Sequence, residues 1–179
     1  LFDQPWDPGM DGDPRFSILH LAGSGDEFEL GFFSDQDEYP VTLFPDSNQQ
    51  EIIYLNMGQL EIGSDLYFGT LVHELQHLLH WNLDKNEATW LNEGLSQLAE
   101  LYVGLDTTLA DPYLLQPDTR LDYWEYEEDV IDAHYASSYL FSVYILEQLG
   151  EDGVYELIRQ PSNGLSAVRS VLEGFQPDR

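Results

Sequence analysis

The spacing of hydrophobic residues along the chain changes character near residue 60. Before that point, short runs rich in β-branched and aromatic residues are separated by Gly, Pro, Asp and Asn, which is the pattern of strands and turns. The runs are RFSILHLAG (15–23), EFELGFFS (27–34), YPVTLF (39–44) and EIIYLN (51–56). Residues 1–60 are therefore predicted to form mainly strands.

From residue 64 to the end, the hydrophobic residues follow helical spacing. The expected helices run from about Ser64 to Asn82, from near Asn86 to before Gly104, over 132–150, around 151–160 and around 165–173. Ser64 or Asp65 is placed to cap the first helix and Gly150 to end the third, with 106–129 as loop. Strands followed by helices indicate an α+β fold, one domain over 1–179 with a mixed sheet packed under the helices.

Composition narrows the classes of partner. Hydrophobic residues make up 42% of 179 residues, which is enough for a core. The net charge is −28, and Lys85 is the only lysine, so phosphate-rich nucleic acid is not an expected partner. No run approaches the ~20 apolar residues of a membrane helix, so no membrane insertion is expected. The chain opens on Leu1 rather than Met, as a mature or trimmed form would.

The chain has no cysteine, so a metal site must use His, Asp and Glu. The stretch GTLVHELQHLLHW (69–81) contains the pattern HExxH, in which His73 and His77 share one face of a helix. Both imidazoles can then reach one zinc ion, while Glu74 is placed to move a proton. The alternative to a zinc site is a structural helix in which both histidines form hydrogen bonds within the core.

A third ligand is expected from the next helix, TWLNEGLSQLAE (89–100). Glu93 lies among apolar residues, where a carboxylate needs a cationic partner, and a short connection makes the two helices antiparallel neighbours. The alternative for Glu93 is an exposed position on an amphipathic helix. His80 is expected to pack near the site rather than bind the ion, and Asn92, Gln97 and Glu100 are candidates to orient the histidines.

The segments HELQH and WLNEG resemble the gluzincins, metallopeptidases that bind one zinc ion through two His and one Glu. WLNEG is especially similar to the aminopeptidase branch, whereas HELQHLLHW is closer to secreted hyicolysin-like and immune-inhibitor-like bacterial peptidases. The resemblance covers residues 51–150. It implies a zincin-like domain, one catalytic zinc on His73, His77 and Glu93, a peptide or protein substrate, and a secreted location.

The same resemblance extends to HYASSYLFSVYILEQLG (134–150). It implies that Tyr135 stabilises the oxyanion of the reaction, unless His134 or Tyr139 does so and Tyr135 is a plain core aromatic residue. The GxMEN stretch that reads a free amino terminus in the aminopeptidases is absent. An endopeptidase is therefore favoured over an aminopeptidase-like exopeptidase. A catalytically inactive peptide-binding scaffold and an autoinhibited precursor fragment are also compatible with these residues.

Two further segments carry predictions. VTLF (41–44) is the expected edge strand against which an extended substrate would lie. The N-terminal stretch DQPWDPGMDGDPRF (3–16) spaces four carboxylates that suit calcium or form a solvated acidic loop: Asp3, Asp7, Asp11 and Asp13.

Overall fold

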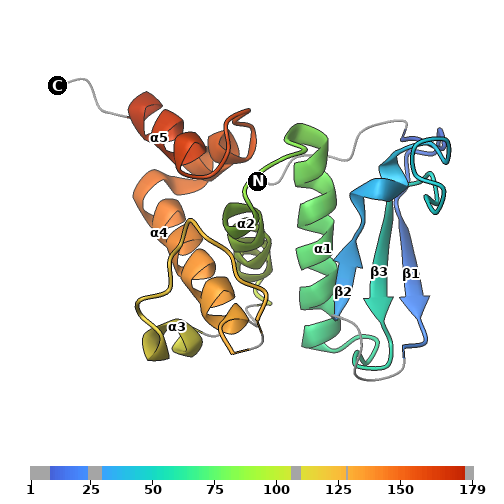
Figure 1. Ribbon diagram of the computed structural model, residues 1–179, viewed down its shortest axis with the longest axis horizontal. Helices are drawn as coiled ribbons and strands as arrows, with labels where there is room; N and C mark the ends of the chain where they lie inside the picture. Colours follow the sequence, from blue (N-terminus) through green and yellow to red (C-terminus); the bar gives the residue numbers. More distant parts are fainter. Residues whose placement is uncertain (1–8, 24–29, 106–109, 128, 176–179) are drawn as a thin grey trace.

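The computed structural model describes residues 9–23, 30–105, 110–127 and 129–175. Within these ranges the chain forms a three-stranded mixed sheet followed by five α-helices, which is roughly the α+β arrangement predicted. Figure 1 shows the elements side by side in the order sheet, α1, α2 and α4, with α5 above α4. The helix with the HExxH pattern thus stands between the sheet and the other helices.

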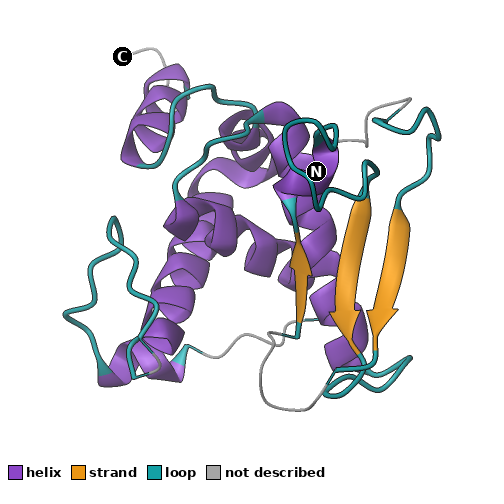
Figure 2. Cartoon of the chain, turned by 45° about the vertical axis from the view of Figure 1, so that its right-hand side comes forward, coloured by secondary structure: helices purple, strands orange, loops and turns teal. Residues whose placement is uncertain are grey.

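The sheet has the order β1-β3-β2, with β3 (Ile52–Asn56) in the centre. β1 (Ser17–Leu21) pairs with β3 in parallel, and the short β2 (Gly31–Phe33) pairs with it in the antiparallel sense (Figure 2). Every residue of β3 is buried, which matches its nearly continuous hydrophobic run. Three of the four predicted strand segments therefore contain a strand.

The prediction of an edge strand over 41–44 is wrong. This segment forms turns, in which the Leu43 and Phe44 amides donate to the Pro40 carbonyl over 2.8 and 3.2 Å. Pro40 and Pro45 bracket the segment, and a proline cannot donate a hydrogen bond to a sheet. A 3-10 helix, Asp35–Glu38, precedes it and was not predicted.

Helix α1 (Asp65–Leu83) confirms the predicted first helix. The Ser64 hydroxyl oxygen accepts from the Tyr67 amide over 3.1 Å and caps its first turn. The sheet-facing side of α1 shares a hydrophobic cluster with β3 and the connection between them: Ile53, Leu55, Leu60, Tyr67, Leu78 and Leu79. This packing sets the rotation of α1 and turns its other side toward α2.

A second hydrophobic cluster joins the remaining long helices, α2 (Thr89–Tyr102), α4 (Ile131–Ile158) and α5 (Leu165–Gly174). α2 begins three residues after the predicted Asn86, because the Asp84 carboxylate accepts from the Asn86 amide and holds a turn there. Gly150, with φ of 68°, interrupts α4 where a helix end was predicted. The short α3 (Asp111–Leu115) lies inside the predicted loop.

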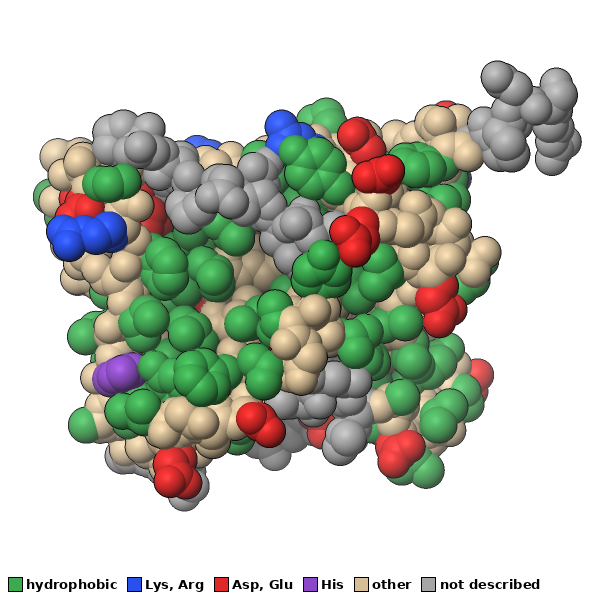
Figure 3. Space-filling view, turned by 180° about the vertical axis from the view of Figure 1, so that it is seen from behind, with side chains coloured by type: hydrophobic (Ala, Val, Ile, Leu, Met, Phe, Trp, Pro, Cys, Tyr) green, Lys and Arg blue, Asp and Glu red, His purple; other side chains and the backbone are tan. Residues whose placement is uncertain are grey.

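Side chains of different kinds are unevenly distributed over the surface. Figure 3 shows hydrophobic side chains gathered across one face, with few acidic groups among them. Exposed apolar residues include Ile18 and Leu19 of the edge strand β1, at 40% and 42% exposure. Among the described helices, none combines the length and the apolar character that crossing a membrane requires.

Candidate metal centre

The site lies between α1 and α2, which run antiparallel. Three side-chain contacts follow the helix pair: His80 with Asn92, His77 with Ser96, and His73 with Glu100. As the residue number rises along α2, the number of its partner on α1 falls. The antiparallel arrangement expected from the short connection is therefore present, and it brings the two halves of the predicted site together.

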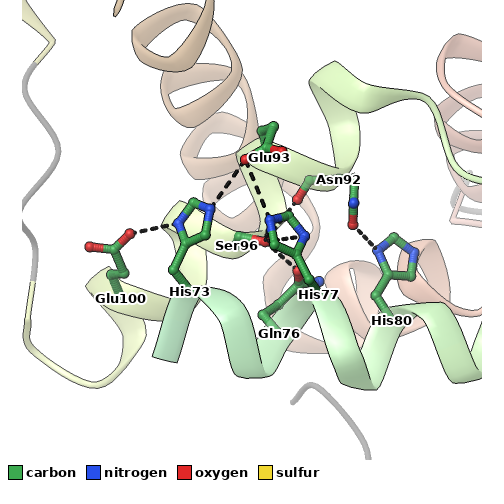
Figure 4. Close-up of polar contacts among 8 residues, drawn as sticks. All are labelled: His73, Gln76, His77, His80, Asn92, Glu93, Ser96 and Glu100. Atoms are coloured by element: carbon green, nitrogen blue, oxygen red, sulfur yellow. Dashed lines mark hydrogen bonds and ion pairs between the residues drawn. The ribbon is translucent and has the colours of Figure 1, made fainter. Parts of the chain in front are cut away.

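The three predicted ligands converge on one point (Figure 4). Glu93 Oε2 lies 3.1 Å from His73 Nε2 and 3.5 Å from His77 Nε2. One ligand atom from each residue falls within 4.8 Å of the others. The two imidazole rings are 4.9 Å apart and nearly perpendicular, at 78°. An ion with bonds of ~2 Å needs only a small adjustment of this triangle.

The opposite nitrogen of each imidazole is held by α2. His73 Nδ1 lies 2.9 Å from a carboxylate oxygen of Glu100, so this nitrogen carries the proton and donates it. His77 Nδ1 lies 3.0 Å from the Ser96 hydroxyl, whose own proton goes to Gln76 Oε1 or the Asn92 carbonyl. Ser96 therefore accepts from His77 through Nδ1, the closer of the two ring nitrogens, while Nε2 lies 3.4 Å from the hydroxyl. Both Nε2 atoms face Glu93, where each donates a proton to this carboxylate or, with that proton displaced, offers a lone pair to a cation.

The electrostatics of the site favour bound positive charge. Burial opposes protonation of His73, but the hydrogen bonds to Glu100 and Glu93 overcome it and raise its pKa to about 10. Burial likewise opposes protonation of His77, and the charge of Glu93 overcomes it and raises the pKa of that imidazole. Glu74, only 6% exposed, raises both pKa values through its charge. A divalent cation at the same point would satisfy these carboxylates in place of protons.

The donor set fits zinc. Two imidazole nitrogens and one carboxylate oxygen are common zinc ligands, and three protein ligands leave one position for water or substrate. The His73, His77 and Glu93 side chains are only 12% to 15% exposed. A desolvated carboxylate at that depth needs a cationic partner, as expected from the sequence.

Of the three predicted orienting residues, Glu100 contacts a predicted ligand. Asn92 instead holds His80, whose Nδ1 lies 3.0 Å from the Asn92 oxygen. Within the described ranges, no hydrogen bond joins Gln97 to either imidazole, and its buried oxygen has no partner. Ser96 was not predicted, although its position three residues after Glu93 places it on the same side of α2.

Tyr135 lies on α4, where its ring packs edge-to-face against Trp124 with centroids 4.9 Å apart. Its competitor His134 also lies against Trp124 and lines a separate cavity of about 450 Å³. Burial lowers the pKa of His134. The other competitor, Tyr139, is buried. The oxyanion role assigned to Tyr135 stays a prediction.

A cavity of about 270 Å³ adjoins two of the three converging residues. His77 and Glu93 line one part of it, and Phe33, from the edge strand β2, lines another. β2 therefore borders the site in the position for which 41–44 was predicted. Its antiparallel pairing leaves its outer edge as the boundary of the sheet.

The predicted calcium segment is described only in part. Asp3 and Asp7 lie outside the described residues. The Asp11 carboxylate accepts from the Asp13 amide over 2.7 Å, and Asp13 forms an ion pair with Arg15 at 2.6 Å. These are the contacts of an acidic turn, and calcium binding stays a prediction.

Comparison of the chain with known proteins adds no relative. No protein-family model matches the chain, and a search of curated proteins finds no significant match. Function is therefore argued from the geometry of the site.

Proposed function

We propose that this protein is a zinc-dependent metallopeptidase that hydrolyses peptide bonds, acting as an endopeptidase. One observation supports the proposal above all others: Glu93 Oε2 lies 3.1 and 3.5 Å from the Nε2 atoms of His73 and His77. Both imidazoles are anchored through Nδ1, so their Nε2 atoms are aimed at one point before any ion binds.

The fold supports the same proposal at a coarser level. A helix with HExxH beside a mixed sheet, an antiparallel edge strand next to it, and a second helix with the third ligand are what a zincin-like domain needs. β2 is the edge along which we place an extended peptide, by strand addition. From the resemblance to secreted bacterial peptidases we also propose an extracellular location.

In the proposed mechanism, His73, His77 and Glu93 would hold the ion. Bound zinc supplies a Lewis acid that polarises a carbonyl group and lowers the pKa of water. The carboxylate of Glu74 takes one proton from the attacking water as the new C–O bond forms. It then gives that proton to the leaving nitrogen as the C–N bond breaks. The Tyr135 hydroxyl donates a hydrogen bond to the carbonyl oxygen when it becomes negative.

The central test is the substitution Glu74→Gln. This variant keeps the shape of the side chain but cannot accept the proton, so we expect hydrolysis of an unstructured protein to fall about 10²–10⁴-fold. Zinc content, measured by atomic absorption, should stay unchanged. Full hydrolysis by zinc-loaded Glu74→Gln protein would remove Glu74 from the mechanism. If the wild type still hydrolyses the substrate after its zinc has been removed, zinc has no part in the mechanism.

Two companion measurements separate the competing classes of protein. Peptides with a blocked amino terminus are cut by an endopeptidase and not by an aminopeptidase. If the wild type binds zinc and also binds an unstructured substrate protein but does not cleave that substrate, the protein is an inactive scaffold.

The oxyanion assignment has its own test. Tyr135→Phe is expected to lower kcat about 10²–10³-fold with little change in KM, because the hydroxyl acts only once negative charge develops. Tyr144→Phe, an exposed tyrosine on the same helix, is the matched control. Equal kcat values for the two variants would move the role to another residue.

A further inference from the structure

A second set of metal-ligand side chains lies where α1 ends. His80, in the last turn of α1, meets Asp84 and Glu87 from the turn that leads into α2. One ligand atom from each residue falls within 4.8 Å of the others. From the sequence, His80 was expected only to pack beside the first site, so this cluster was not predicted.

His80 is held in a way that leaves one nitrogen available. Its Nδ1 lies 3.0 Å from the Asn92 side-chain oxygen, which accepts the proton of that nitrogen. The Nε2 atom therefore carries the lone pair. Nε2 is buried and has no hydrogen-bond partner among the described residues, in a side chain that is 1% exposed overall.

The two carboxylates are held in the same manner. One oxygen of Asp84 accepts from the Asn86 amide, and one oxygen of Glu87 accepts from the amides of Ala88 and Gly164. The other oxygen of each carboxylate is buried and has no hydrogen-bond partner within the described part of the chain. Each of the three residues is thus anchored by one polar atom and has a second, buried one that no described group satisfies.

Three buried polar atoms without partners are costly, at about 1–3 kcal/mol each and more for a charged group. The neighbouring cation does not relieve them. The ammonium of Lys85 lies over the Trp81 ring, 4.3 Å from its centroid, and no ion pair between Lys85 and Asp84 or Glu87 is found among the described residues. A single bound cation would satisfy all three atoms at once.

The donors indicate the class of cation. Carboxylate oxygens bind most divalent ions, but an imidazole nitrogen selects first-row transition ions over magnesium and calcium. We propose that His80, Asp84 and Glu87 form a second metal site that takes a divalent first-row ion such as zinc. Because Glu87 also holds the Gly164 amide at the start of α5, the ion ties the turn between α1 and α2 to α5.

The second site borders the first. Asp84 and Glu87 line the same cavity of about 270 Å³ as His77 and Glu93. Asn92, which holds His80, precedes Glu93 on α2. An ion at the second site therefore also fixes the start of the helix that carries the third ligand of the first. The second site does not depend on the proposed peptidase activity.

The test is the number of zinc ions that the chain retains. The 179-residue protein is stripped with a chelator, equilibrated with zinc, passed through gel filtration at high salt to remove loosely held ions, and assayed by mass spectrometry. We expect two equivalents in the wild type and one in Asp84→Asn/Glu87→Gln. His77→Ala should also keep one, and the combined variant none. Asp35→Asn, an exposed acid lining the same cavity, should keep two.

The two substitutions keep the oxygens that accept from backbone amides, so the fold should survive, as circular dichroism will show. A measurement on unaltered protein removes any remaining dependence on the variants: anomalous diffraction at the zinc edge should give a peak within bonding distance of His80 Nε2. The second site alone is overturned if the wild type retains one equivalent of zinc and His77→Ala retains none. It is also overturned if no anomalous peak lies near His80 Nε2. If the wild type retains one equivalent of zinc, and this zinc is lost only in Asp84→Asn/Glu87→Gln, the first site is overturned and the second is supported.

Discussion

At the scale of single residues, the site depends on the contacts that side chains of α2 make with each imidazole. Glu93 faces both Nε2 atoms, while Glu100 and Ser96 hold the Nδ1 atoms of His73 and His77. The proposed carboxylate ligand and both anchors thus come from one helix, so a rotation of α2 would disturb all three together. The anchors fix the tautomer of each imidazole, which decides whether its lone pair meets an ion.

Removing a side chain that holds an Nδ1 atom should lower the zinc affinity of the site, although all three proposed ligands remain. We expect Glu100→Ala and Ser96→Ala each to lower zinc affinity about 10–100-fold, because the imidazole then spends time in other orientations and tautomers. Competition with a chelating dye measures the affinity. Gln97→Met, a buried control on the same helix, should match the wild type. Unchanged affinity in both anchor variants would show that the Nδ1 contacts do not position the histidines.

The surroundings of Glu38 disfavour the ionised form of its carboxyl group. Burial, followed by the nearby charge of Glu51, raises the pKa of Glu38 to about 8. A carboxyl group whose pKa is higher in the folded protein than the ordinary 4.5 stabilises the fold below about pH 4.5. That contribution is lost as the pH rises through about 8.

Glu38→Gln should therefore stabilise the protein at alkaline pH and have little effect at acid pH. At pH 9 we expect a gain of about 1–2 kcal/mol in the free energy of unfolding, below the full linkage value because solvent screens part of the interaction. Urea unfolding at pH 4.5 and pH 9 measures the difference. The exposed Glu61→Gln serves as the control. An equal effect of Glu38→Gln at both pH values would contradict the assigned cause.

At the scale of elements, α2 is the helix on which the site depends most. It contacts α1 through the polar residues of the site, and its other side packs against α4. Gly94, directly after Glu93, makes the close approach to α4 possible. A Cβ atom at this position would lie 2.6 Å from the Ser138 carbonyl oxygen and 2.6 Å from the Ser142 hydroxyl.

Gly94→Ala should be destabilising even though alanine favours helices. The close contact with α4 backbone should cost about 1–3 kcal/mol, more than the ~1 kcal/mol that alanine contributes to helix propensity. Because α2 must move, zinc affinity should fall as well. Thermal unfolding and zinc binding are the measurements. Gly174→Ala, at a glycine of α5 with open space around it, should leave zinc affinity unchanged and should not destabilise the protein. A more stable Gly94→Ala protein would refute the close packing of the two helices.

At the scale of the whole molecule, the dominant property is charge. The chain carries 34 acidic and 6 basic residues, so the folded state concentrates negative charge. Self-repulsion of this kind opposes compactness and is screened by salt.

We expect the Tm to rise by a few degrees as NaCl is raised from about 0.02 M to about 0.3 M, because screening relieves the folded state more than the expanded one. Calcium chloride at equal ionic strength is the comparison. A larger rise with calcium, reversed by a calcium chelator, would support the predicted site that includes Asp11 and Asp13. An unchanged or falling Tm in NaCl would show that repulsion does not limit stability.

Much of the local structure could be predicted because its determinants are local. The Ser64 cap, the helical spacing of α1 and the glycine at 150 act within one or two turns of the chain. The nearly continuous apolar run over 51–56 identified the buried central strand. The four-residue spacing of His73 and His77 places both on one helical face in any fold that keeps the helix. The hydrophobic residues of 41–44 predicted a strand, but the prolines on either side of this segment prevent one, so the prediction failed there.

By itself, the sequence determined the long helices, the central strand, and which three side chains are able to share a metal ion. The tertiary structure decided what depends on the angle between helices. The antiparallel packing of α1 on α2 brings Ser96 and Glu100 to the imidazoles, and directs Asn92 to His80 instead. The turn between the helices brings His80, Asp84 and Glu87 to one point. Periodicity specifies which side of a helix a residue occupies, whereas packing specifies what that side meets.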